Sequence, residues 1–135
     1  MKKQLWLLVI ISLLCATGFT SKLFSAGVRE FNDGNYKKAI INFQNVVKNY
    51  PTEAIVHYNL GMAYFKAERY PESQSSFEAA LQLEGKFEPL ARFYIGLCYY
   101  QKGDNDRAKQ ELQWVSQICD NTNLGDAAKE MIKSM

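Results

Sequence analysis

Residues 54–83 constrain the fold of this chain more than any other segment, because they have the pattern of two helices folded against each other. Apolar residues recur at helical spacing in each half of the segment, and the polar pair Glu68-Arg69 separates the halves. Gly61 lies inside the first helix, where glycine costs roughly 1 kcal/mol relative to alanine. That cost is usually accepted for close helix packing. We expect the second helix to pack against Gly61 through Ser73 and Ala80.

The same hairpin pattern occurs three times along the chain, with a period of about 34 residues. Gly27, Gly61 and Gly96 occupy equivalent positions, and Tyr64 and Tyr99 follow the second and third of these glycines at the same distance. A single helical hairpin would be weak evidence of a repeat. Three hairpins in register indicate a helical array.

This pattern resembles the tetratricopeptide repeat, whose consensus is Trp-x2-Leu-Gly-x2-Tyr followed by Ala, Phe and Pro. The resemblance covers roughly residues 20–120, and the Trp positions are its clearest departure, since they hold Leu23, His57 and Arg92. The residues that match are Leu60-Gly61-x2-Tyr64, Ile95-Gly96-x2-Tyr99, Gly34-x-Tyr36-x2-Ala39 and Pro51. The resemblance implies an all-α fold, a right-handed α-solenoid of three helical hairpins plus a C-terminal capping helix.

The predicted boundaries follow from turn signals between the periodic segments. The repeats cover about 20–53, 54–88 and 89–122, within a domain of residues 20–135. The expected helices are 20–33, 36–49, 54–67, 70–83, 89–102, 105–119 and 123–134. The last of these has Leu124, Ala128 and Met131 on one side and charged residues on the other. A stack of repeats needs such a polar-backed terminal helix to cover its last apolar face, so helix 123–134 is predicted to be the cap.

The first nineteen residues have the pattern of a targeting segment. Lys2 and Lys3 precede an apolar run, as in a secretory signal, and the small residues near Gly18 suit cleavage there. Two alternatives remain: residues 1–19 are an uncleaved N-terminal membrane anchor, or Cys15 is lipidated. With the two lysines held inside, all three alternatives predict an extracytoplasmic domain, periplasmic or membrane-associated and exported by its N-terminal signal.

The residues that could support catalysis are few. The chain has one histidine, His57, and no Ser or Cys arrangement accompanies it. Cys98 and Cys119 are predicted to lie too far apart along their antiparallel helices for a disulfide. We therefore expect no catalytic residues, no metal site and no cofactor. The formal net charge of +2 without a basic stripe also argues against nucleic acid.

In proteins of this resemblance, the first helix of each hairpin lines a concave surface where partners usually bind. Each of these helices carries a second apolar stripe at i, i+4, i+7 spacing beside the core stripe. The stripes are Phe24, Val28 and Phe31; Tyr58, Met62 and Phe65; Phe93, Leu97 and Tyr100. The predicted partner-binding residues are Phe24, Val28, Tyr58, Asn59, Met62, Phe65, Phe93, Tyr94, Leu97 and Tyr100.

Within this set, Asn59 and Tyr94 are placed to hydrogen-bond a peptide backbone, and Tyr58 and Phe93 are expected side by side as central anchors. Exposed apolar patches on soluble domains usually mark binding sites. The alternative is that Phe31, Phe65 and Tyr100, at the ends of the stripes, pack against neighbouring helices, and that the other residues merely fill a tight superhelix.

The sequence therefore predicts a non-catalytic protein–protein interaction module outside the cytoplasm that binds a partner segment in an aromatic concave groove. A role in envelope assembly is suggested only by analogy with exported proteins of this fold. The alternative is a structural subunit or self-assembling scaffold docked permanently in a larger membrane-associated complex. The expected partner is a protein or peptide, with a possible membrane anchor through the N-terminal segment.

Overall fold

The computed structural model describes residues 22–83 and 87–135, and the predicted leader, including Cys15, lies outside this part of the chain. The described residues form seven helices and no strand. The helices are α2 (Lys22–Asn32), α3 (Tyr36–Asn49), α4 (Ala54–Lys66), α5 (Tyr70–Leu83), α6 (Glu88–Gln101), α7 (Asn105–Ile118) and α8 (Asn123–Ser134). Every predicted helix is present, with ends within two residues of the expected ones.

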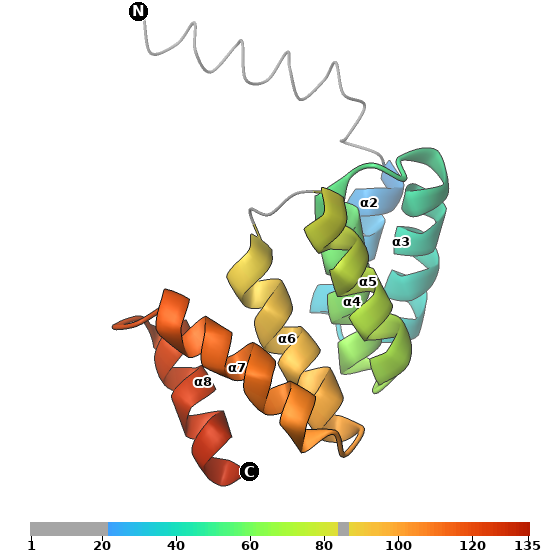
Figure 1. Cartoon of the computed structure of the whole chain (residues 1–135). Coiled ribbons are helices and arrows are strands. Elements are labelled where there is room, and N and C mark those ends of the chain that lie inside the picture. The colour runs from blue at the N-terminus through green and yellow to red at the C-terminus, as the bar shows by residue number, and fades with distance from the viewer. Residues whose placement is uncertain (1–21, 84–86) are drawn as a thin grey trace, which may run out of the picture.

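The helices stack as consecutive antiparallel hairpins in a curved array, with α8 at the C-terminal end (Figure 1). The hairpins are α2/α3, α4/α5 and α6/α7, and each second helix also packs on the first helix of the next hairpin. The first helices touch one another as well, α2 with α4 and α4 with α6, so they form one layer. The predicted all-α solenoid of three hairpins plus a terminal helix is confirmed.

Close helix packing at the repeated glycines is confirmed, but its contacts differ from those expected. A Cβ atom on Gly61 would lie 3.0 Å from the ring of Phe77, and Gly27 and Gly96 face Phe43 and Leu112 in the same way. Sequence reasoning expected Ser73 and Ala80 to be the partners of Gly61. The Ser73 hydroxyl does donate a hydrogen bond of 2.8 Å to the Gly61 carbonyl, but the Phe77 ring occupies the space that glycine leaves.

The turns inside the hairpins follow the predicted signals where glycine is present. Gly34 and Gly103 have φ of 78° and 79°, a left-handed conformation that glycine adopts without steric cost. In the middle hairpin the non-glycine residue Glu68 takes this place, with φ of 59°. The next residue, Arg69, donates its backbone N–H to the Tyr64 carbonyl at 2.9 Å, which closes the helix end.

The hydrophobic core is divided along the stack, with one large buried side chain from each second helix. Phe43, Phe77 and Leu112 are at most 1 % exposed and lie at equivalent positions of the three hairpins. Helix α8 covers the last of them: Ala128 joins the cluster of Leu112 and Val115. The predicted capping role of α8 is therefore confirmed.

The two cysteines of the described residues are free thiols, as expected. Cys98 is buried and Cys119 is half-buried. Burial raises the pKa of the Cys98 thiol above its usual value. In the part of the chain that the structure describes, no helix is long and apolar enough to cross a membrane.

Candidate protein-binding site

The ten predicted binding residues all lie on the layer of first helices. Helix α2 contributes two of them, α4 contributes four and α6 contributes four. Every one of the ten side chains is half-buried, the burial expected of residues that line a surface rather than a core. We refer to this set as the concave face.

The structure separates the concave face into residues that support the core and residues that do not. Tyr58, Met62 and Tyr94 pack against the buried cluster around Phe77. Phe24 and Val28 pack against the cluster around Phe43, and Phe93 packs against the cluster around Leu112. These six side chains therefore contribute to the packing of the hairpins.

Phe65, Leu97 and Tyr100 differ from the other apolar residues of the concave face. Within the described residues they pack against none of the three buried clusters, although each is half-buried. Phe65 makes edge-on ring contacts with Tyr70 and Tyr94. Phe65 therefore packs on neighbouring helices, whereas Leu97 and Tyr100 are the apolar residues of the face for which the described residues show no packing on a buried cluster.

A group of aromatic rings forms the centre of the concave face. Tyr94 stacks on Phe77 with ring centroids 5.4 Å apart, and Tyr58 meets the same ring edge-on at 5.5 Å. Tyr58 also stacks on Phe87 at 5.1 Å. Such aromatic pairs are worth about 0.5–1.5 kcal/mol beyond the area they bury. The rings therefore hold α4, α5 and α6 in a fixed relation.

The predicted placement of Tyr58 beside Phe93 stays a prediction. The α6 ring that shares Phe77 with Tyr58 is Tyr94, whereas Phe93 packs toward Leu112 in the last hairpin. Phe93 and Tyr94 are neighbours in sequence but point about 100° apart around the helix axis, because a helix has 3.6 residues per turn. Phe87 was missed because it precedes the periodic part of α6.

Burial raises the pKa of two tyrosines of the concave face. Burial, reinforced by the nearby Tyr94, raises the pKa of Tyr58 to about 12, and burial also raises the pKa of Tyr94. Both hydroxyls are therefore protonated donors at neutral pH. The amide N–H of Asn59 is already used in a 2.7 Å bond to the Ile55 carbonyl, so this side chain has less capacity for a peptide than expected.

Alkaline titration should reveal the environment of Tyr58. Its pKa is about 12 in the folded state against 10.0 ordinarily, so the unfolded state releases this proton first. The contribution of Tyr58 to stability is present below pH 10 and is lost as the pH rises through about 12. Urea unfolding at several pH values should show a shallower alkaline fall for Tyr58→Phe than for the unsubstituted chain. Parallel falls would contradict the burial of this hydroxyl.

The residues at the Trp positions of the repeat make structural contacts. His57 is half-buried rather than a core residue, and its Nε2 lies 2.8 Å from the Pro51 carbonyl oxygen. Arg92 bonds Glu88 and Glu111, each at 2.9 Å, and lies over the ring of Trp114. In the described part of the chain, no group of His, Cys, Asp and Glu side chains is placed to hold a metal ion.

Sequence comparisons match the same repeat. The tetratricopeptide repeat family model matches residues 24–83 and, overlapping, residues 58–114. Among curated proteins, anaphase-promoting complex subunit 6 of Arabidopsis thaliana is 29 % identical over 75 residues, which are 56 % of this chain and 14 % of that protein. The chain thus spans only a small part of this relative.

Solved structures show the same fold. One is the type III secretion chaperone SycD of Yersinia enterocolitica in complex with a peptide of the translocator YopD; it is 20 % identical, with 84 % of this chain and 88 % of that chain covered and a TM-score of 0.76. Another is the second TPR domain of human RPAP3 in complex with an HSP70 peptide; it is 23 % identical, with 82 % and 92 % covered and a TM-score of 0.73. With the match over residues 24–114, these likenesses show that the chain belongs to the tetratricopeptide repeat family.

Proposed function

We propose that this protein is a non-catalytic, extracytoplasmic interaction module that binds an apolar segment of a partner protein on its concave face. The observation that carries the proposal is the pair Leu97 and Tyr100, which are half-buried and, among the described residues, do not pack on the core clusters. Fold relatives support it, since structures of SycD and RPAP3 hold peptides of YopD and HSP70. The extracytoplasmic location rests on the leader sequence, and a role in envelope assembly is an analogy from fold.

The chemistry of the face indicates what kind of segment it binds. Its centre is aromatic, and its two central tyrosines stay neutral. Three basic residues adjoin the face in sequence: Arg29 and Lys66 are exposed, and Arg92 is paired with Glu88 and Glu111. An aromatic surface with hydroxyl donors favours apolar side chains with free backbone carbonyls between them, rather than a carboxylate-rich tail.

A structural role in a larger assembly is the second candidate. Large apolar side chains are exposed at the ends of several helices, away from the centre of the concave face. They are Leu23, Leu83, Leu90 and Ile118, with 39–61 % of each exposed. Exposed apolar side chains can mark permanent interfaces where they form a contiguous patch. Size-exclusion chromatography with light scattering separates self-assembly from the binding of another protein.

Crosslinking in the native envelope tests the concave face. The full chain carrying Leu97→Glu should capture at least about tenfold less of its crosslinked partner, because truncating or charging a central interface position removes a large share of binding energy. Tyr100→Ser gives the same test without an added charge. Ile118→Glu is the matched control on α7, where the side chain is 61 % exposed, and it should leave capture unchanged.

Melting curves show whether a loss of capture comes from lost binding or from lost folding. Variants that melt like the unsubstituted chain and lose the partner support the concave face. Undiminished capture by both Leu97→Glu and Tyr100→Ser would overturn it. Equal loss with the Ile118→Glu control would favour the structural role instead.

A further inference from the structure

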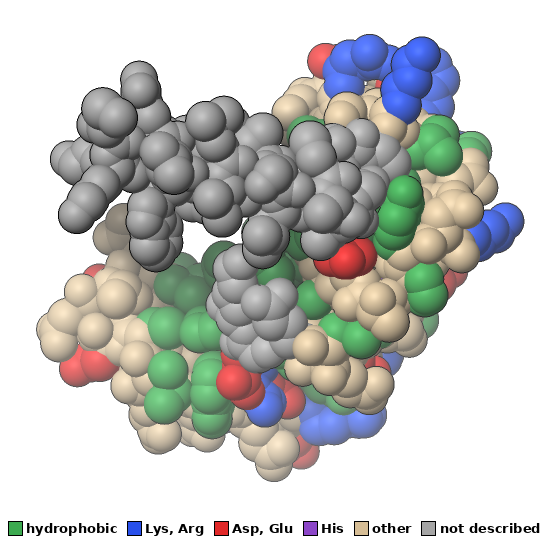
Figure 2. Space-filling model, turned by 90° about the horizontal axis from the view of Figure 1, so that it is seen from above, with side chains coloured by type: hydrophobic (Ala, Val, Ile, Leu, Met, Phe, Trp, Pro, Cys, Tyr) green, Lys and Arg blue, Asp and Glu red, His purple; other side chains and the backbone are tan. Residues whose placement is uncertain are grey.

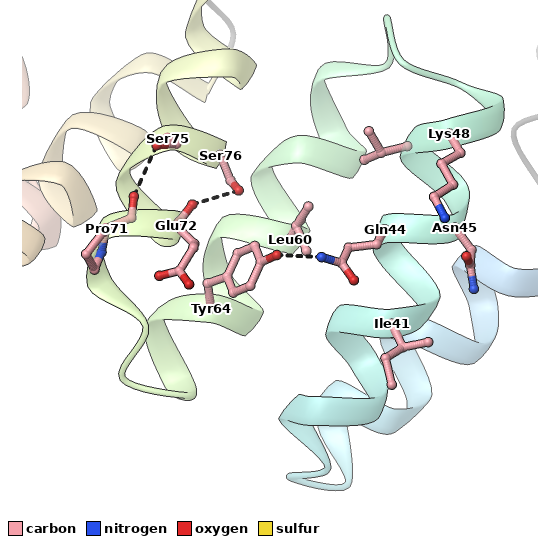
Figure 3. Close-up of a pocket in the computed structure, with 11 residues that line it drawn as sticks. Ile41, Gln44, Asn45, Lys48, Leu60, Tyr64, Pro71, Glu72, Ser75 and Ser76 are labelled. Atoms are coloured by element: carbon pink, nitrogen blue, oxygen red, sulfur yellow. Dashed lines mark hydrogen bonds between the residues drawn. The ribbon is translucent and has the colours of Figure 1, made fainter.

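A second hollow lies on the outer side of the array, between α3 and α5 (Figure 3). Its volume is about 790 Å³, enough for several side chains. Leu60 and Tyr64 of α4 line its base and are 7 % and 6 % exposed. Ile41 of α3 lines its rim. We call this hollow the α3–α5 slot; it shares no residue with the concave face.

The slot is open because its α5 wall is built from small side chains. Pro71, Ser75 and Ser76 line this wall. The hydroxyl of Ser75 donates to the Pro71 carbonyl at 3.1 Å, and that of Ser76 donates to the Glu72 carbonyl at 2.9 Å (Figure 3). Both serines therefore satisfy their hydrogen bonds within α5 and leave the slot clear.

The base of the slot is held in place by a hydrogen bond from the α3 side. The Gln44 amide donates to the Tyr64 hydroxyl at 2.7 Å, and the two side chains meet across the slot in the close-up (Figure 3). The Arg69 guanidinium lies over the Tyr64 ring, 4.7 Å from its centroid. The slot is therefore formed before any partner arrives, which lowers the entropic cost of binding.

The rim of the slot combines an exposed aliphatic side chain with positive charge, since Ile41, which is 57 % exposed, and Lys48 both line it. Lys37 lies on the same face of α3, four residues before Ile41, and lines a neighbouring hollow. Helix α3 contains no acidic residue, and within the described residues neither lysine forms an ion pair. The space-filling view shows Lys and Arg side chains along the edge of the molecule with hydrophobic side chains between them (Figure 2).

Among the described residues, the acidic residue that lines the slot is an ionised carboxylate already paired with an arginine. Glu72 of α5 forms a 2.6 Å ion pair with Arg69, and hydrogen bonding from this arginine lowers the pKa of the Glu72 carboxyl. The slot therefore presents uncompensated positive charge from Lys48 beside an apolar base. A segment that complements the slot therefore has an aliphatic side chain next to Asp or Glu side chains.

We propose that the α3–α5 slot is a second docking site, which takes an acidic amphipathic helix of a partner protein. One aliphatic side chain of this helix enters the slot beside Ile41, and flanking Asp or Glu side chains pair with Lys37 and Lys48. Helices bind grooves in this way through apolar residues spaced three or four positions apart. Because the slot and the concave face share no residue, the protein can hold two segments at once.

A defined peptide probe tests the proposal on the full chain. The probe is a fluorescein-labelled helical peptide with leucine at every third or fourth position and glutamate elsewhere. A comparison peptide has lysine in place of glutamate. Fluorescence anisotropy should show binding of the acidic peptide only, weakening as salt is raised because exposed charges are screened. Ile41→Glu and Lys48→Glu should each weaken binding by about tenfold or more.

Two control variants make the result specific to the slot. Ile118→Glu places the same charge on an equally exposed isoleucine of α7 and should bind the acidic peptide normally. Tyr58→Phe alters the concave face and should also bind normally. Equal binding of the acidic and basic peptides, or equal weakening by Ile41→Glu and Ile118→Glu, would overturn the proposal.

Two other occupants of the slot are distinguished by the same variants. A dimer of the unsubstituted chain that Ile41→Glu dissociates, seen by light scattering, would assign the slot to a second copy and overturn the proposal. Binding to anionic phospholipid vesicles that Lys48→Glu removes, without binding of the acidic peptide, would assign it to a membrane surface. If the concave face binds no partner, the peptide result is unaffected. The two proposals can therefore be refuted independently.

Discussion

Replacing Phe77 with alanine should lower the free energy of unfolding by about 3–5 kcal/mol, the range for truncating a fully buried phenylalanine. Phe77 is 0 % exposed, its ring fills the space beside Gly61, and the rings of Tyr58 and Tyr94 rest on it. Three helices meet at this one side chain. The cavity cannot collapse easily, because the surrounding rings are held by their own partners. Urea unfolding followed by circular dichroism measures the loss.

Leu83→Ala is the matched control for Phe77→Ala. Leu83 lies on the same helix as Phe77, but its side chain is 41 % exposed. Its truncation should therefore change the free energy of unfolding by no more than about 0.5 kcal/mol. Phe77→Ala should also weaken partner capture, since the aromatic centre of the concave face loses its support. A melting curve of Phe77→Ala that matches that of Leu83→Ala would show that the hairpins do not pack through this ring.

The fold was predictable from the sequence because its signals repeat. Each hairpin carries the same apolar spacing, and Gly27, Gly61 and Gly96 mark the same close contact three times. An error in one unit is corrected by the other two. The cap was predictable for a related reason: an amphipathic terminal helix is what the last hairpin requires.

The detailed binding surface was less predictable, because it depends on how successive hairpins are rotated. The ten predicted residues lie on the first helices of the hairpins, but the sequence could not show that Tyr94, rather than Phe93, shares Phe77 with Tyr58. That outcome depends on the crossing angle of α4 and α6, which no local spacing encodes. The sequence also could not distinguish Tyr58, which packs on the cluster around Phe77, from Leu97, which packs on none of the clusters of the described residues.

The α3–α5 slot lay beyond sequence reasoning for a different reason. It arises where small residues on α5 face Ile41 and Gln44 on α3, and these segments are joined only through α4. Serines on an exposed helix face are common in any sequence. Their contribution to a binding site can be recognised only when the α3 residues that face them are known.

The close contact between α7 and α8 reverses the usual effect of a glycine-to-alanine change. On helix propensity alone, Gly125→Ala in α8 should stabilise the protein by about 1 kcal/mol. In the structure a Cβ atom at this position would lie 2.1 Å from the Cys119 carbonyl oxygen, which is a backbone atom that cannot turn aside. Gly125 also donates its N–H to the Thr122 hydroxyl, the cap of α8, at 3.1 Å.

We therefore expect Gly125→Ala to destabilise the protein by about 1–3 kcal/mol from overpacking, and by about 1 kcal/mol more if the cap is lost. Helix α8 must move away from α7, which exposes the cluster of Leu112, Val115 and Ala128. Thermal unfolding and amide exchange in α8 measure the effect. Thr122→Ala, which removes the cap but adds no atom beside Cys119, should lose only about 1 kcal/mol. A stabilised Gly125→Ala variant would show that α8 is free to shift, and the contact that closes the solenoid would then be looser than the structure shows.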